Sequence, residues 1–197
     1  LVTKVVVATD DDVVADIGRS CGADILIRPK ELCRDISPID DTLNFACREI
    51  GNSMGAQIDQ LLWLQADVPV RLPGMIDRAV STLSVDQHAT AAVTGYQVSQ
   101  HPGWMKKLNS DGFLVPLDSD ARAHRMQDLP EHFLLDGAVV AIRPAYLEKA
   151  RATSGPHQYL GPRPRLLLHE HPMYSLNIDT DVQLELAEFY LRKISQR

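Results

Sequence analysis

The sequence predicts a three-layer α/β/α fold in which helices cover both faces of a mainly parallel sheet. Short apolar runs alternate along the chain with segments that carry apolar residues at helical spacing. The chain has 197 residues, 45% of them hydrophobic and 23% charged, which suits one domain with a sizeable core over 1–197. Only the stretch Gln97–Glu131 interrupts the alternation, and we expect it to be an insertion (97–131).

The amino-terminal half is expected to contain three strand–helix units. A β-branched run at Val5–Ala8 is followed by acidic residues that can cap a helix, and Gly22 can end that helix. A proline begins the third helix. These signals predict strands over Val5–Ala8, Asp24–Arg28 and Gln60–Leu64, and helices over Val13–Cys21, Asp40–Ile50 and Pro73–Leu83.

The carboxyl-terminal half continues the pattern after one hairpin. Turn-forming residues at Asn109–Gly112 lie within the run Trp104–Leu117, which predicts that this run folds as a hairpin inside the insertion. The remaining runs predict strands over Thr90–Tyr96, Leu135–Ile142 and Arg165–His169, and helices over Pro144–Ala152 and Val182–Ile194.

Composition excludes several classes of function. A formal net charge of -6 gives no support for sequence-independent binding of nucleic acid, which depends on clustered lysine and arginine. The three cysteines form no Cys-x-x-Cys pair, so neither a disulfide framework nor a zinc cluster is indicated, and we expect a reducing cytoplasm. No apolar run reaches the length of about 18 residues that a membrane span requires.

Two distant segments are expected to form one metal site. Asp67 follows a buried strand, which delivers it to the carboxyl edge of the sheet, where open α/β folds bind ligands. Asn177 and Asp179 alternate across Ile178, so on a strand end both point to one side. Such oxygen ligands suit Mg²⁺ that carries substrate phosphates. Alternatively, Asp67 caps the next helix and residues 177–179 form a turn.

A histidine pair near the carboxyl terminus is a weaker candidate. His169 and His171 flank Glu170 and lie on one side of a predicted strand. No third ligand at metal-binding spacing accompanies them in the sequence. We therefore expect solvent-facing histidines here rather than a zinc site.

Six short segments follow one another along the chain: Val7-Ala8-Thr9-Asp10, Arg28-Pro29-Lys30-Glu31-Leu32, Leu64-Gln65 with Pro69 and Arg71, Arg125-Met126-Gln127-Asp128-Leu129-Pro130, Asp136-Gly137-Ala138, and Ser175-Leu176-Asn177-Ile178-Asp179-Thr180. Taken in this order, they resemble the acylneuraminate cytidylyltransferases, the enzymes that activate nonulosonic acids such as sialic acid as CMP-sugars. The resemblance covers nearly the whole chain and implies a Rossmann-like nucleotidyltransferase fold.

The resemblance implies a Mg²⁺-dependent reaction of CTP with a nonulosonic acid that releases pyrophosphate. It places Asn177 and Asp179 at the metal and Asp10 and Arg28 at the nucleotide, and we expect Asp67, Asp179 and Arg28 to be the catalytic set. Residues expected to contact the sugar are Gln65, Arg71, Arg125, Gln127 and Asp136.

The sequence also departs from that family. Asn177 stands where the family has aspartate, and Asp67 stands where it has a small hydroxyl residue, so a carboxylate has moved rather than vanished. The order Gln65-x-Asp67-x-Pro69 resembles enzymes that make CMP-KDO. Met126, Asp136 and Gln183 also replace common family residues. Another sugar nucleotidyltransferase, CMP-KDO-like or GTP-using, is therefore an alternative.

Two further expectations follow from the same resemblance. Nothing in the sequence matches the family's opening strand and basic phosphate-binding loop, so we expect a fragment of a longer enzyme or, alternatively, a truncated, non-catalytic sugar- or nucleotide-binding homologue. The family pairs its subunits through the insertion. The apolar residues Tyr96, Trp104, Met105 and Phe113 could form a patch on the predicted hairpin, which predicts a homodimer. Alternatively, this patch packs on the parent domain.

Overall fold

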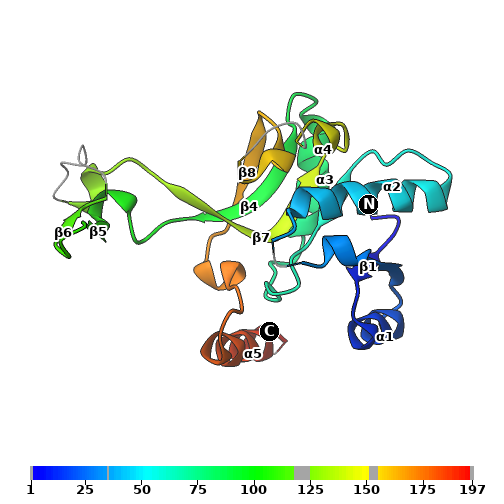
Figure 1. Cartoon of the computed structure of the whole chain (residues 1–197), viewed down its shortest axis with the longest axis horizontal. Helices are drawn as coiled ribbons and strands as arrows, with labels where there is room; N and C mark the ends of the chain where they lie inside the picture. The colour runs from blue at the N-terminus through cyan, green and yellow to red at the C-terminus, as the bar shows by residue number, and fades with distance from the viewer. Residues whose placement is uncertain (1, 35, 118–124, 151–154, 196–197) are drawn as a thin grey trace. The chain divides into compact units, whose positions relative to one another are not determined.

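The computed structural model describes residues 2–34, 36–117, 125–150 and 155–195, and the chain divides into two compact units (Figure 1). The expected insertion is therefore described except for 118–124, and the expected helix Pro144–Ala152 except for its last two positions. Unit 1 comprises Leu1–Gln65, Leu72–Val93 and Val139–Leu167, and unit 2 comprises Ala66–Arg71, Thr94–Ala138 and Leu168–Arg197.

The order of elements confirms the predicted alternation of strands and helices. The strands are β1 (Val6–Thr9), β2 (Asp24–Ile27), β3 (Leu61–Trp63), β4 (Ala91–Gln97), β5 (Lys106–Leu108), β6 (Leu114–Pro116), β7 (Phe133–Ile142) and β8 (Pro164–Leu168). The α-helices are α1 (Asp12–Ser20), α2 (Ile39–Met54), α3 (Met75–Val85), α4 (Ala145–Ala150) and α5 (Asp181–Ser195). Short 3-10 helices lie at η1 (Lys30–Leu32), η2 (Pro102–Trp104), η3 (Met126–Asp128), η4 (Gln158–Leu160) and η5 (Pro172–Ser175).

The strands form a four-stranded sheet and two smaller pairs. The larger sheet has the order β3-β7-β4-β8, in which β7 runs antiparallel to β3. The backbone bonds Thr90 N to Arg163 O and His169 N to Gly95 O join β4 and β8 in parallel. β1 and β2 form a separate parallel pair. The bonds Arg143 N to Thr90 O and Val98 N to His132 O join β4 and β7 antiparallel. β3, β4 and β8 therefore share one direction, β7 runs opposite to both of its neighbours, and the four-stranded sheet is mixed.

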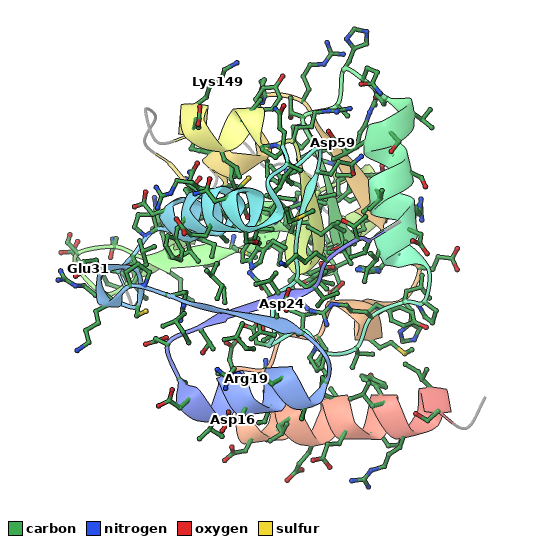
Figure 2. The ribbon with its side chains drawn as sticks, turned by 90° about the vertical axis from the view of Figure 1, so that its right-hand side faces the viewer. Asp16, Arg19, Asp24, Glu31, Asp59 and Lys149 are labelled. Atoms are coloured by element: carbon green, nitrogen blue, oxygen red, sulfur yellow. The ribbon has the colours of Figure 1, made fainter. Side chains whose placement is uncertain are left out.

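Helices cover both faces of the sheet in unit 1. Buried residues of α3, including Met75 and Leu83, pack against Ala92, Val139 and their neighbours on one face. The alternate residues of β4 and β7 are also buried, so the opposite face is covered as well. Figure 2 shows α3 on one side of these strands and α2 with α4 on the other. This layering confirms the three-layer α/β/α fold.

Helix α1 lies directly on the β1–β2 pair. The Asp11 side chain accepts a hydrogen bond of 2.9 Å from Val14 N and so caps the first turn, as the acidic cluster predicts. A Cβ at Gly18 would lie 2.9 Å from Ile25 Cδ1 and 3.1 Å from Val7 Cγ2, so a larger residue here would require these side chains or the helix to shift.

Two helix boundaries differ from the prediction for the same reason. α3 begins at Met75, not at Pro73, because Gly74 has a φ of 79° and precedes the helix as a left-handed residue. α2 continues past Ile50 to Met54, because the left-handed cap is Gly55 with a φ of 60°.

The predicted hairpin is present in unit 2. β5 and β6 pair antiparallel, and the Asn109 side chain accepts hydrogen bonds from Asp111 N and Phe113 N in the turn. Among the helices in the described part of the chain, none combines the length and the apolar character needed to cross a membrane.

Candidate metal and nucleotide site

The two segments predicted to share a metal ion meet within unit 2. Asp67 lies in a turn after β3, and Ile178 N donates a hydrogen bond of 2.9 Å to Asp67 O. This bond fixes the backbone between Asn177 and Asp179 against the backbone that carries Asp67. The Asp67 and Asp179 side chains are both exposed, so solvent and a charged ligand can reach both carboxylates.

Asn177 has the features of a cation ligand. Asn177 Nδ2 lies 3.4 Å from Asp179 Oδ2, which places the two side chains on one side of the chain, as their alternation predicts. Asn177 Oδ1 is buried and has no hydrogen-bond partner. Because an unsatisfied buried carbonyl is costly, this oxygen is positioned to accept a ligand such as a metal ion.

The start of α5 holds this segment in place. Gln183 Oε1 accepts hydrogen bonds from Asp179 N at 2.8 Å and from Thr180 Oγ1 at 2.9 Å. Gln183 stands where the resembled family has an acidic residue, and its amide oxygen performs this capping without adding charge.

Arg71 provides the positive charge in this part of unit 2. Its side chain is half-buried, and Arg71 Nε donates a hydrogen bond of 2.7 Å to Ala138 O. Burial lowers the pKa of Arg71, while the carboxylates of Asp67 and Asp136 act in the opposite direction. Arg71 thus lies within electrostatic reach of a proposed metal ligand and of the buried carboxylate described next.

Asp136 is the centre of a buried polar cluster. Asp136 Oδ1 accepts hydrogen bonds from Thr94 Oγ1 at 2.5 Å and from Ala138 N at 2.9 Å. Asp136 Oδ2 accepts one from Ser175 Oγ at 2.6 Å and lies 2.9 Å from His169 Nε2. The side chain is only 1% exposed. Donors from the protein therefore already bind this carboxylate. Direct contact between Asp136 and a sugar would require some of these hydrogen bonds to break.

The donors keep Asp136 ionised despite its burial. Burial raises the pKa of Asp136, but the contacts with His169, Ser175, Thr94 and Ala138 N together outweigh it, and the pKa lies below its usual value.

The expectation that His169 faces solvent is wrong. Its side chain is 0% exposed and lies beside Asp136, and His169 Nδ1 is buried without a hydrogen-bond partner. His171, two residues later, is exposed, as expected. One imidazole is buried and the other exposed because β8 ends at Leu168. The alternation of a strand therefore does not extend through His169 and His171.

Thr94 and Ser175 were not singled out by the sequence reasoning. Thr94 is a fully buried hydroxyl residue inside an otherwise apolar strand, and such a residue requires a hydrogen-bond partner. That requirement was the available signal for Thr94. Ser175 gave none, because its partner lies 39 residues away in the sequence.

Asp10 and Arg28 pair in unit 1. The register of β1 and β2 aligns Thr9 with Ile27, so the next residues of the two parallel strands come together, and Arg28 NH2 lies 2.7 Å from Asp10 Oδ1. Hydrogen bonds from Arg28 and then Cys33 lower the pKa of Asp10. Arg28 Nε is buried without a hydrogen-bond partner, so this guanidinium keeps a donor available for an anion.

The remaining residues predicted to contact the sugar belong to both units. Gln65 is half-buried in unit 1. Arg125 and Gln127 are exposed near η3 in unit 2, where Arg125 Nε lies 4.0 Å from Asp128 Oδ2. Within the described contacts of unit 2, none joins Arg125 or Gln127 to Asp67, Asn177 or Asp179.

The donor set of the proposed metal site fits a hard cation. In the described ranges, no three histidine, cysteine, aspartate or glutamate side chains gather at metal-binding spacing. The proposed set instead combines two carboxylates with the unpartnered amide oxygen of Asn177. Oxygen-only sets of this kind suit Mg²⁺, which retains waters and phosphate oxygens as its other ligands.

Comparison with known proteins establishes the fold. No protein-family model matches the chain. A solved CMP:2-keto-3-deoxy-manno-octonic acid synthetase complexed with CTP is similar to it, with 18% identity, a TM-score of 0.65, and coverage of 98% of this chain and 82% of that one. The 4-diphosphocytidyl-2C-methyl-D-erythritol synthase from Anaerococcus prevotii DSM 20548 shares 12% identity and a TM-score of 0.59, over 97% of this chain and 82% of that one. The chain therefore has the three-layer, Rossmann-like nucleotidyltransferase fold.

Proposed function

We propose that the protein is a cytidylyltransferase that activates a nonulosonic, sialic-type acid with CTP. The anomeric hydroxyl oxygen of the sugar acid would form a bond to the α-phosphorus of CTP, the bond from that phosphorus to the bridging oxygen would break, and pyrophosphate would leave. The hydroxyl proton would pass to solvent. The observation that carries this proposal is the backbone bond between Ile178 and Asp67, which brings the oxygen ligands of two distant segments together.

Asp67, Asn177 and Asp179 would hold Mg²⁺ through their side-chain oxygens. The ion would offset the charge of the triphosphate and of the developing transition state. The Ile178–Asp67 bond fixes the backbone that carries these residues before substrate binds, and Gln183 holds the backbone N of Asp179 at the start of α5. Such fixed ligands lower the cost of ordering the reactants in line.

Arg28 would bind the nucleotide. Its Nε–H has no partner, and its terminal nitrogen is held by Asp10 at 2.7 Å, so the guanidinium is oriented before ligand arrives. A planar guanidinium can donate two parallel hydrogen bonds to a phosphate or carboxylate. Asp10 would orient Arg28, and the lone pairs of its carboxylate that Arg28 does not use would accept hydrogen bonds from the ligand.

Arg71 would attract the carboxylate of the sugar acid. Its positive side chain lies within electrostatic reach of both Asp67 and Asp136, and its Nε donates a hydrogen bond to Ala138 O. Gln65, Arg125 and Gln127 are proposed as further sugar contacts by resemblance. Their exposed or half-buried positions leave their side chains accessible to a ligand.

A second candidate is a cytidylyltransferase for KDO. The order Gln65-x-Asp67-x-Pro69 favours it, and so does the likeness of the whole chain to a CMP-KDO synthetase structure. The two candidates share the metal, nucleotide and chemistry, and they differ only in the sugar acid. A GTP-using enzyme and a non-catalytic binding protein are the remaining alternatives.

Direct synthesis tests these candidates. The full chain is incubated with Mg²⁺, one of the nucleotides CTP, GTP, UTP or dTTP, and either N-acetylneuraminate, legionaminate or KDO, and pyrophosphate and sugar nucleotide are measured. We expect pyrophosphate and a CMP-sugar only with CTP and a nine-carbon acid. CMP-KDO alone would replace the first candidate by the second. CTP binding measured by calorimetry without any product would support the non-catalytic alternative.

We further propose that the protein forms a homodimer through its hairpin. Trp104 and Met105 are each 42% exposed, and Phe113 is 69% exposed. Exposed apolar residues gathered on one small element are costly in water unless a partner covers them. A second copy of this chain is the partner that the resemblance suggests.

A further inference from the structure

We infer that Asp136 is a positioning residue that holds the metal-binding segment in place through Ser175. The inference rests on the proposed function, because it concerns the ligands Asn177 and Asp179. It assigns Asp136 a role that is distinct from direct contact with the sugar.

Asp136 links several elements of unit 2. Its hydrogen-bond donors come from β4 (Thr94), from β7 itself (Ala138 N) and from η5 (Ser175), and His169 Nε2, in the residue after β8, lies 2.9 Å from its carboxylate. A buried carboxylate with this many donors is rigid, since each lost donor would leave charge uncompensated in an apolar environment. Asp136 is therefore a fixed point for the segments that contact it.

The segment that contains Ser175 leads directly to the proposed metal ligands. Ser175 ends η5, and Asn177 follows two residues later with its unpartnered, buried Oδ1. The backbone of this segment is held at Ser175 by Asp136 and at Ile178 by Asp67 O. Asn177 lies between these two attachments, so its position depends on both.

A positioning role of Asp136 differs from simple stabilisation of the fold in what the loss of each hydroxyl would do. Thr94 and Ser175 each donate one hydroxyl hydrogen to the same carboxylate, but only Ser175 belongs to the segment that carries Asn177. If Asp136 only stabilised the fold, removing either hydroxyl would have the same kind of effect. If it positions the ligands, only the loss of the Ser175 hydroxyl weakens metal binding.

The test compares Ser175→Ala with Thr94→Val in the full chain. Mn²⁺ replaces Mg²⁺ as the probe, and free Mn²⁺ is counted by electron paramagnetic resonance in the presence of CTP. The Mn²⁺ that CTP binds in a protein-free control is subtracted. Near-ultraviolet circular dichroism and urea unfolding confirm that each variant is folded and report its stability. We expect Ser175→Ala to weaken Mn²⁺ binding by about 10-fold, the lower end of the effect seen when partners of metal ligands are removed.

Two further variants sharpen the comparison. Ser175→Thr retains the hydroxyl, so it should restore most of the Mn²⁺ affinity. Asp136→Asn retains the shape but loses the charge, so it should weaken Mn²⁺ binding at least as much as Ser175→Ala. If either of these variants does not fold, the comparison of Ser175→Ala with Thr94→Val still decides the question.

The outcomes distinguish failure of the inference from failure of the proposed function. Equal Mn²⁺ affinities in Ser175→Ala and Thr94→Val, with tight binding by the unaltered chain, would overturn the inference alone. Absence of Mn²⁺ binding by the unaltered chain with CTP would overturn the metal site and the inference together. Weakened binding in Ser175→Ala and not in Thr94→Val supports the inference.

Discussion

Asp67 and Ile178 are joined by a backbone hydrogen bond of 2.9 Å, although they lie far apart in the sequence. Asp67 follows β3, whereas Ile178 lies between η5 and α5. The bond brings Asp67 next to Asn177 and Asp179, whose side chains lie on the same side of the chain. This relationship is the basis of the proposed metal site.

Asp67→Asn is expected to reduce metal-dependent nucleotidyl transfer. The change removes one of the two carboxylates and keeps the shape of the side chain. We expect kcat to fall by about 10²- to 10³-fold, the range found when one electrostatic contact to a transition state is removed. Stability should change little, because Asp67 is exposed. Steady-state rates at varied Mg²⁺ concentration provide the measurement.

Asp59→Asn is the matched control for Asp67→Asn. It makes the same chemical change at another exposed aspartate, which precedes β3 in unit 1 (Figure 2). The control should retain the unaltered rate and metal dependence. An unchanged rate in Asp67→Asn as well would remove Asp67 from the metal site.

Arg28→Lys is expected to weaken CTP binding while the chain stays folded. Lysine keeps the charge but lacks the buried Nε–H and the planar fork, so it cannot reproduce two parallel hydrogen bonds. Loss of one hydrogen bond to a charged group corresponds to about 1.5–3 kcal/mol, or roughly 10- to 100-fold in the dissociation constant for CTP. Calorimetric titration with CTP measures this change.

Arg19→Lys is the control for Arg28→Lys. Arg19 also contacts an aspartate, Asp16, at 2.6 Å, but this pair is exposed on α1 (Figure 2). Exposed pairs of this kind contribute little. CTP affinity should therefore be unaffected in the control, and equal losses in both variants would contradict a specific role for Arg28.

The structure also predicts a pH dependence of stability that Asp136 causes. Its folded-state pKa lies below the usual value of 3.8, so the unfolded state binds more protons as the pH falls through that region. The stability from the ionised carboxylate is therefore present above about pH 4 and is lost below it. Urea unfolding of the unaltered chain and of Asp136→Asn, at about pH 6 and about pH 3, measures this dependence.

We expect the free energy of unfolding to differ more between these two proteins at the higher pH than at the lower one. In the acidic solution the unfolded chain takes up a proton at this carboxyl, so the unaltered protein loses part of its stability advantage over the variant. A difference that is the same at both values would show that ionisation of Asp136 does not contribute to stability.

Sequence reasoning was sufficient where one strand or one pair of strands determined the geometry. Asp10 and Arg28 follow neighbouring parallel strands, and the register alone brings them together. Asn177 and Asp179 share a side, as alternation predicts, although the segment between η5 and α5 forms no strand. The predicted order of strands and helices was correct for the same reason, since each element was identified from its own apolar pattern.

Sequence reasoning failed where several segments had to meet. Three other parts of the chain contact the Asp136 carboxylate, through Thr94, Ser175 and His169, and none of those pairings has a local signal. His169 was expected to face solvent because only its own strand was considered, whereas its burial depends on the packing of β8 beside β4 and on Asp136. Boundaries near glycine also failed, because a positive φ at Gly74 depends on the path of the following helix.

The proposed dimer predicts that Phe113→Asp yields a monomer. Phe113 and Leu114 are 69% and 72% exposed on the hairpin, so a charge there would have to be buried in the interface. Loss of a central aromatic residue costs about 2 kcal/mol or more in such interfaces, which is roughly a 30-fold rise in the dissociation constant.

Val85→Asp, at an 86% exposed position at the end of α3, introduces the same charge away from the hairpin and should leave the dimer intact. Light scattering coupled to size-exclusion chromatography measures both variants, and a monomeric unaltered chain at micromolar concentration would contradict the proposal.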